Sequence, residues 1–163
     1  MKNFSARKLT QAAAIAAIYV VLTYITNLFG LANGVVQVRV SEALAVLPYF
    51  TATAIPGLFI GCLLSNILTG CIAADVIFGS IATLIGAVAG RYLSKFNKYL
   101  TPIPTVISNM IIVPLVLKYA YGIPGSVWYF MLTVGAGEII SCCVIGILFM
   151  LFLEKHHPER LFE

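Results

Sequence analysis

The most constraining feature of this sequence is the length of its uncharged stretches. Thirty uncharged residues separate Lys8 from Arg39, and 32 separate Glu42 from Asp75. Four further long stretches follow, of 15, 19, 19 and 15 uncharged residues. A helix of about 20 apolar residues is long enough to cross the hydrocarbon core of a bilayer. The chain is therefore predicted to be an integral membrane protein made of helices.

The composition excludes a water-soluble globular protein. Hydrophobic residues make up 61% of the 163 residues and charged residues only 10%, whereas soluble domains carry roughly 25% charged residues. The mean hydropathy is +1.01. No small-residue cleavage site follows the first apolar run, so we expect an uncleaved first span rather than a signal peptide. We expect residues 1–163 to form a single membrane domain.

Helix-breaking residues set the number of predicted spans. The 32-residue stretch would form a helix of roughly 48 Å, which is too long for one crossing, and it contains the breaker pair Pro56-Gly57. We therefore divide it in two. The six predicted spans are residues 9–29, 42–54, 57–71, 75–95, 102–119 and 127–153.

Six spans place most of the positive charge on one side of the membrane. One side then carries Lys2, Arg7, Lys8, Arg91, Lys95, Lys98, Lys155 and Arg160, and the other carries Arg39 and Lys118. Because basic residues gather in cytoplasmic loops, both termini are predicted to be cytoplasmic. Five spans would move the cluster 91–98 to the outside, which this rule disfavours. The predicted fold class is an all-α bundle of six transmembrane helices, in a multi-pass protein of the cell membrane.

Carboxylates within or beside the spans are the first candidates for a binding site, because ionisable groups are costly in hydrocarbon. Glu138 lies deep in the last predicted span, after the small residues 135–137, and we expect it to face a ligand. Glu42 and Asp75 begin spans at the outer side. Each of these two has an alternative role as a capping acid at a helix N-terminus.

Amides and aromatic residues extend the candidate site. Asn66 and Asn109 lie within predicted spans, where they either hydrogen-bond neighbouring helices or contact the ligand. Trp128 belongs to a group of aromatic residues near the outer ends of the last two spans. An interfacial aromatic belt explains most of this group, and one member could stack on a flat ligand.

The longest outer loop, residues 31–40, contributes two further candidates. Its valines alternate with Gln37 and Arg39, which predicts a short strand. Such a loop could cover a pocket as a lid, and a plain connector is the alternative. The inner halves of the spans contain almost no polar residues, whereas a channel needs them throughout. We therefore expect a polar pocket that is open to the exterior and closed on the cytoplasmic side.

Several motifs are missing or uninformative. The chain has no G-x-x-x-x-G-K-[ST] phosphate loop, so we expect no ATP hydrolysis and no enzymatic activity in this chain. The four cysteines, Cys62, Cys71, Cys142 and Cys143, fit neither a metal-binding spacing nor a disulfide framework. They are predicted to be small apolar side chains, with no metal bound.

Small residues in the first span predict a helix-packing face. Ala12 and Ala16 form one small-xxx-small pair near the start of the span, and Ala13 and Ala17 form a second. Such pairs let another helix approach closely within a membrane.

Several segments together resemble a known family. They are Gln37-Val-Arg39-Val-Ser41-Glu42-Ala-Leu, Leu47-Pro48-Tyr-Phe, Ile55-Pro56-Gly57-Leu-Phe, Asn66, and Asp75-Val-Ile-Phe-Gly79-Ser80-Ile-Ala-Thr83-Leu-Ile-Gly86. This pattern is similar to the QueT family, the substrate-binding S components of energy-coupling factor (ECF) transporters for queuosine precursors. The similarity runs from the first span to the sixth and is densest over residues 37–90.

The resemblance implies a particular architecture and particular partners. It implies a six-helix bundle with cytoplasmic termini, bound to a transmembrane coupling subunit and two ATPase subunits that use ATP. Docking would use the face of Ala12 and Ala16, or that of Ala13 and Ala17. The S component would then topple in the membrane to release its substrate inside. No cofactor in this chain and no nucleic-acid partner is expected.

The implied ligand is the base preQ1 or a related 7-deazaguanine. Its protonated aminomethyl group needs a carboxylate, and its guanine-like edge offers two N–H donors to another. We expect Glu138 to accept from the edge and Glu42 or Asp75 to bind the ammonium, with an amide such as Asn66, Asn109 or Gln37 at the ring oxygen. Two alternatives stay open: an S component for another vitamin or purine, and a solitary homo-oligomeric transporter.

Overall fold

The computed structural model describes residues 6–31 and 37–156. All regular elements in this part of the chain are helices, joined by turns and loops, and it contains no strand. The elements are α1 (Ala6–Leu28), η1 (Val40–Tyr49), α2 (Ala54–Leu68), α3 (Ala73–Leu93), η2 (Lys98–Leu100), α4 (Ile103–Leu115), η3 (Val116–Ala120), α5 (Val127–Glu138), η4 (Ile139–Ile145) and α6 (Gly146–Lys155). η1 and η2 are 3₁₀-helices, whereas η3 and η4 are π-helical continuations of α4 and α5.

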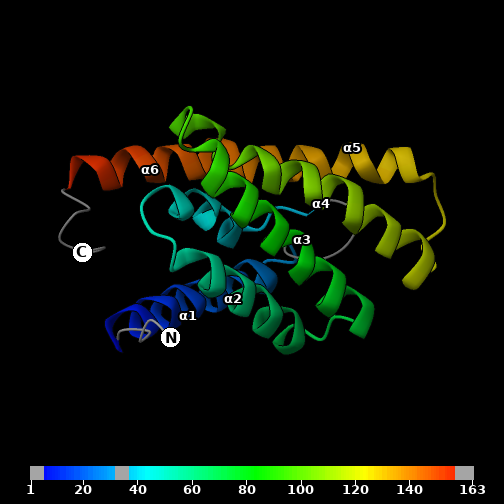
Figure 1. The fold of residues 1–163 in the computed structure, drawn as a ribbon. Coiled ribbons are helices and arrows are strands. Elements are labelled where there is room, and N and C mark those ends of the chain that lie inside the picture. Colours follow the sequence, from blue (N-terminus) through cyan, green and yellow to red (C-terminus); the bar gives the residue numbers. More distant parts are fainter. Residues whose placement is uncertain (1–5, 32–36, 157–163) are drawn as a thin grey trace.

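The helices form an elongated bundle (Figure 1). α5, η4 and α6 follow one another as a single long rod along one side, and α1 and α2 lie on the other side, with α3 between them. The start of α1 and the end of α6 lie at the same end of the bundle. α1 packs against α2 and α3 packs against α4, while η1 packs against α1, α3, η4 and α6. The short helix η1 therefore lies in the interior of the bundle.

Four helical segments are long and apolar enough to cross a membrane: 6–28, 73–93, 98–120 and 127–155. The segments predicted as the second and third spans are shorter. Residues 42–54 were expected to be a span, but the structure has the 3₁₀-helix η1 of ten residues there, with Pro48 inside it. At about 2 Å per residue, this helix covers roughly 20 Å. α2 has 15 residues. The described helices thus give four full-length spans rather than the six that were predicted.

α1 and α2 approach closely because α2 presents glycines to α1. A Cβ atom added at Gly57 would lie 2.9 Å from the carbonyl oxygen of Ala12, and one at Gly61 would lie 2.7 Å from Cβ of Tyr19. Ala12 and Ala16 are consequently buried in this internal contact. Close approach through small residues is the usual way for helices to associate in a membrane.

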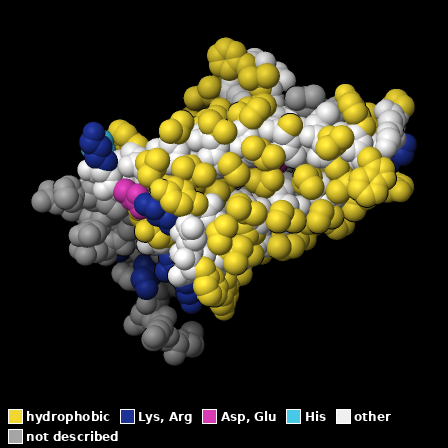
Figure 2. Space-filling view, turned by 90° about the horizontal axis from the view of Figure 1, so that it is seen from above, with side chains coloured by type: hydrophobic (Ala, Val, Ile, Leu, Met, Phe, Trp, Pro, Cys, Tyr) yellow, Lys and Arg dark blue, Asp and Glu magenta, His cyan; other side chains and the backbone are white. Residues whose placement is uncertain are grey.

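Charged side chains gather at one end of the bundle, whereas apolar side chains cover its flanks (Figure 2). We call the end that carries Lys8, Arg91, Lys98 and Lys155 the basic end; it is also where α1 begins and α6 ends. The exposed apolar flanks are those expected of a surface in contact with lipid.

Candidate functional site

A set of polar side chains is buried inside the bundle, away from the basic end. We call this set the polar cluster; its members are Tyr19, Arg39, Glu42, Asn66, Asp75, Asn109, Glu138 and Cys142, and each is less than 10% exposed. They come from α1, the segment before η1, η1 itself, α2, α3, α4, α5 and η4. Buried charges are retained only where they are paired or used. The cluster is therefore the leading candidate for a functional site.

Two carboxylates and a thiol form the centre of the cluster. The ligand atoms of Glu42, Glu138 and Cys142 all lie within 4.8 Å of one another. The hydroxyl of Tyr19 donates a hydrogen bond to Oε1 of Glu42, and Sγ of Cys142 donates to Oε2 of Glu138 at 3.2 Å. Oε2 of Glu42 is buried and has no hydrogen-bond partner in the described part of the chain. By distance these three residues could hold a metal ion, although here the thiol serves as a donor to Glu138.

Cys142 departs from its predicted role as a small apolar side chain. It is fully buried, but its thiol contacts a carboxylate rather than apolar atoms alone. Asn109, one of the predicted amides, also lies in hydrogen-bonding contact with Glu138. Glu138 is thus approached from α4 and from the next turn of its own helix, where α5 gives way to the π-helical η4. π-helical turns within α-helices are frequent at functional sites.

Arg39 is the buried cation of the cluster. Its Nη1 donates to Oδ1 of Asn66 at 3.4 Å, and Nδ2 of Asn66 donates to the carbonyl oxygen of Asp75 at 3.4 Å. The charge of Arg39 also attracts those of Asp75 and Glu42. The structure therefore brings residues 39, 42, 66 and 75 together, as the sequence analysis predicted for a common site.

Glu42 and Asp75 do not act as side-chain caps of their helices. η1 begins after Arg39 and α3 after Ile72, and neither helix has a side-chain cap hydrogen bond. The carboxylate of Glu42 instead contacts Tyr19. Both acids nevertheless lie in the first turn of their helices, where the helix dipole favours a negative charge, so this part of the alternative role is confirmed.

Tyr121, which follows η3, contacts the first turn of α3 through its hydroxyl. Its hydroxyl donates to Oδ2 of Asp75 at 3.2 Å and accepts from the backbone N–H of Ile72 at 3.3 Å. Burial raises the pKa of Tyr121 to about 12, and the nearby charge of Asp75 acts in the same direction. The other oxygen of Asp75, Oδ1, is buried without a hydrogen-bond partner in the described chain. In the sequence analysis, Tyr121 belonged only to the group of aromatic residues near the outer ends of the last two spans. The sequence signal for its special position is the following Gly122, which adopts a φ of 66° in a turn.

The segment before η1 packs into the bundle against α5. A Cβ atom added at Gly137 would lie 1.6 Å from the carbonyl oxygen of Gln37, so only glycine fits at this position. Gln37 and Arg39 are both buried. The predicted strand is absent from residues 37–39, and the N–H of Val38 donates to the carbonyl of Leu31 at 2.9 Å. Residues 32–36 of the predicted strand and lid lie outside the described residues. The described part of this loop packs on the residue next to Glu138, and its role as a lid or a plain connector stays a prediction.

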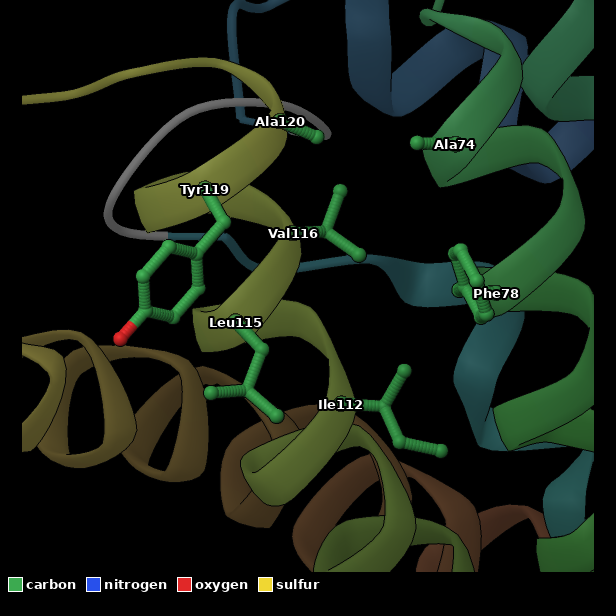
Figure 3. A pocket seen from close by; sticks show the side chains of 7 residues that line it. All are labelled: Ala74, Phe78, Ile112, Leu115, Val116, Tyr119 and Ala120. Carbon is green, nitrogen blue, oxygen red and sulfur yellow. The ribbon is translucent and has the colours of Figure 1, made fainter.

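Glu42, Asp75 and Glu138 are buried in the described part of the chain. None of them lines any of five surface openings found there. The one nearest in sequence to Asp75 is an apolar opening of about 390 Å³ between α3 and α4 (Figure 3), lined by Ala74, Phe78, Ile112, Leu115, Val116, Tyr119 and Ala120. Residues 32–36 of the outer loop lie outside the described residues, and the outward-open pocket stays a prediction.

The predicted aromatic contact and the predicted docking face both lie apart from the polar cluster. Trp128 is 75% exposed and lies outside the cluster. Ala12 and Ala16 are buried against α2, whereas Ala13 and Ala17 are exposed on α1. Of the two predicted docking pairs, only the second is accessible to a partner.

Comparison with known families decides the class of this protein. A model of the QueT transporter family matches residues 9–155. The chain belongs to the QueT transporter family. Together with the four long apolar helices, this membership makes it a membrane protein of a transporter family, as the resemblance implied. Searches of curated proteins and of solved structures found no match.

Proposed function

We propose that this QueT family member is the substrate-binding S component of an ECF importer and that it captures preQ1 or a related 7-deazaguanine. Family membership supports the transport role, and the polar cluster supports the nature of the ligand. Within the cluster, one guanidinium, that of Arg39, faces three carboxyl groups, those of Glu42, Asp75 and Glu138. A ligand that carries a protonated amine would offset part of this surplus of acidic groups.

The single observation that carries the proposal is the pair of buried carboxylate oxygens that lack partners. Oε2 of Glu42 and Oδ1 of Asp75 accept no hydrogen bond in the described chain. An unsatisfied buried acceptor is costly, by about 1–3 kcal/mol. A base with several N–H donors would satisfy such acceptors, and Glu138, beside Glu42, would accept from the guanine-like edge.

Binding requires the substrate to reach the buried acids. On the outer side, the segment at 37–39 packs on Gly137, and Tyr121 forms hydrogen bonds with Ile72 and Asp75. We propose that they separate to admit the substrate and close over it. The substrate is then released on the other side when the chain is docked on its coupling module.

The remaining parts of the proposal concern orientation and partners. We propose that η1 and α2 complete a six-helix bundle, and that the basic end faces the cytoplasm, as the positive-inside rule predicts. The exposed pair Ala13 and Ala17 on α1 would dock onto a transmembrane coupling subunit. The chain itself would hydrolyse no ATP, and two partner ATPase subunits would supply that activity.

The binding test uses purified protein and preQ1 in isothermal titration calorimetry. We expect Glu138→Gln to weaken binding by about a hundredfold or more, because removal of one partner from a buried charged contact costs about 3–5 kcal/mol. Glu154→Gln, at the exposed ion pair of the basic end, is the matched control and should bind like the wild type. Equal affinity of the Glu138 variant and the wild type would exclude the proposed site.

Two further measurements separate the alternatives. Mass spectrometry of small molecules that co-purify with the chain identifies a 7-deazaguanine, another purine or a vitamin. An S component should co-purify with a coupling subunit and two ATPases. Uptake by vesicles that contain this chain alone, without ATP, would instead identify a solitary transporter.

A further inference from the structure

An opening at the basic end is separate from the polar cluster. It has a volume of about 610 Å³ and lies between α1, the turn that joins η1 to α2, and α3. Its lining residues are Lys8, Phe50, Thr51, Ala52, Thr53, Ile55, Pro56 and Arg91. No member of the polar cluster lines it, and the proposed substrate has no part in the argument that follows.

Two cations line this opening, and neither is paired with a carboxylate in the described part of the chain. Nη1 of Arg91 donates to the carbonyl oxygens of Pro48 and Tyr49 at 2.7 and 2.8 Å. A guanidinium has five N–H donors, and the remaining donors of Arg91 have no acceptor among the described residues. Lys8 likewise has no hydrogen bond or ion pair there.

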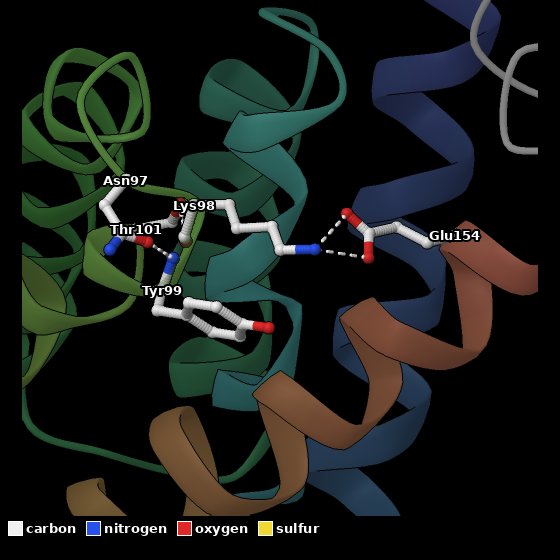
Figure 4. A network of polar contacts seen from close by, with 5 residues as sticks. All are labelled: Asn97, Lys98, Tyr99, Thr101 and Glu154. Atoms are coloured by element: carbon white, nitrogen blue, oxygen red, sulfur yellow. Dashed lines mark hydrogen bonds and ion pairs between the residues drawn. The ribbon is translucent and has the colours of Figure 1, made fainter.

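The contrast with Lys98 shows that the basic end can pair its cations where an acid is available. Nζ of Lys98 lies 2.7 and 2.9 Å from the two carboxylate oxygens of Glu154 (Figure 4). The opening between α1 and α3 has no carboxylate in its lining. Its two positive charges are therefore available to an external anion.

The rest of the lining is both polar and apolar. The hydroxyls of Thr51 and Thr53 lie 2.8 Å apart. Phe50, Ile55 and Pro56 supply apolar walls. The residues that follow the two cations, Leu9 and Tyr92, are 64% and 65% exposed. A ligand that enters here thus meets cations, hydroxyls and an apolar surface of the kind that contacts lipid.

We propose that this opening binds the phosphate of an anionic phospholipid headgroup. Lys8 and Arg91 would contact the phosphate, and the apolar walls would contact the first carbons of the acyl chains. The hydroxyls of Thr51 and Thr53 are already donors to Thr53 and Gln11, so they would orient the turn rather than bind the phosphate. The position at the edge of the apolar flanks favours a lipid over a free anion. Basic residues between helices at a membrane surface are a known form of site for acidic headgroups.

The test measures lipid binding to the full-length chain by native mass spectrometry, with phosphatidylglycerol and phosphatidylcholine as probes. We expect phosphatidylglycerol to be retained preferentially. Lys8→Gln should lower its binding about fivefold, in line with about 1 kcal/mol for each basic residue near an anionic surface. Lys98→Gln is the matched control, because that cation is already paired with Glu154, and it should leave binding unchanged. Lys8 is exposed and makes no hydrogen bond or ion pair with the described residues, so its variant should fold normally.

Four outcomes would overturn the proposal. The first is equal retention of the two lipids, and the second is an equal loss of binding in the Lys8 and Lys98 variants, which would indicate unspecific attraction. The third is displacement of the lipid by about 10 mM inorganic phosphate, which would assign the site to a free anion. The fourth is normal phosphatidylglycerol binding by Lys8→Gln together with failure to co-purify with other subunits, which would assign the cation to protein docking. None of these outcomes depends on whether preQ1 is the substrate.

Discussion

The polar cluster and the basic end both contain charged side chains, yet they differ in how the charges are paired. In the cluster, carboxyl groups outnumber the guanidinium of Arg39, and oxygens of Glu42 and Asp75 lack partners although they are buried. At the basic end, Lys98 and Glu154 form a complete ion pair while their side chains remain 30% and 27% exposed. Exposed pairs contribute little to stability, whereas buried unpaired groups are costly. Incomplete pairing in the interior is therefore the stronger sign of function.

The largest effect is expected from a change that disturbs the backbone packed beside the polar cluster. Gly137→Ala places a methyl group on the carbonyl oxygen of Gln37, which is backbone and cannot move aside cheaply. We expect the free energy of unfolding to fall by at least about 2 kcal/mol and preQ1 affinity to fall at least tenfold. Thermal unfolding in detergent and calorimetry measure the two effects.

Gly135→Ala is the control for this change. A Cβ atom there would lie 2.7 Å from Sδ of Met110, a flexible side chain that can change its rotamer. Its effect on both measurements should be clearly smaller. Equal losses in the two variants would mean that α5 tolerates no methyl group on this face, and the segment at 37–39 would then have no special role.

A smaller effect is expected at the outer edge of the cluster. Tyr121→Phe removes the donor to Asp75 and the acceptor for Ile72, so we expect a loss of about 1 kcal/mol near pH 8. The folded-state pKa of Tyr121 is about 12 against an ordinary value near 10. The contribution of this group is therefore fully present below pH 10 and is lost as the pH rises toward 12.

Thermal unfolding at pH 9 and at pH 11.5 checks this expectation. The difference in stability between the wild type and Tyr121→Phe should shrink at the higher pH, because the unfolded wild type then loses the Tyr121 proton that the folded protein still retains. Thr133→Val, which removes a hydrogen bond from a hydroxyl that does not ionise to the carbonyl oxygen of Phe130, is a control whose difference should not follow this titration. A pH-independent difference at Tyr121 would show that its hydroxyl does not hold Asp75.

The smallest effect is expected at the basic end. Lys98→Gln should lower stability less than any of the changes above, because solvent screens the charges of its pair with Glu154. The loss should become smaller still in 1 M salt, which screens exposed charges. Denaturation at low and high salt measures it. A loss as large as that of Gly137→Ala would contradict the contrast between the two regions.

The sequence predicted the long helices well because their limits are set locally. The predicted spans 75–95 and 127–153 correspond to the observed helical segments 73–93 and 127–155. Each is a predominantly apolar stretch bounded by charged or turn residues, and hydrocarbon requires such a stretch to be helical. The prediction for 42–54 was wrong in type, since Pro48 and the surrounding packing favour a short 3₁₀-helix that no apolar length could reveal.

The candidate site was predicted in part. Residues such as Glu42 and Glu138 were identified because a carboxylate in an apolar stretch is conspicuous by itself. Tyr19 and Cys142 were missed because a tyrosine or a cysteine in a membrane span is ordinary until its neighbour is known. Both became part of the cluster only because other helices place a carboxylate against them.

The sequence alone thus determined which residues are charged and how far each lies from the end of its apolar stretch. It also determined that the chain is helical and lies in a membrane. Only the tertiary structure decided that Ala12 and Ala16 face α2 while Ala13 and Ala17 stay exposed, and that the acids meet in a buried cluster. The physical reason is that helical periodicity defines the faces of a helix but not which helix or loop backbone packs against each face. That choice depends on close contacts between distant residues, such as Gly137 and Gln37.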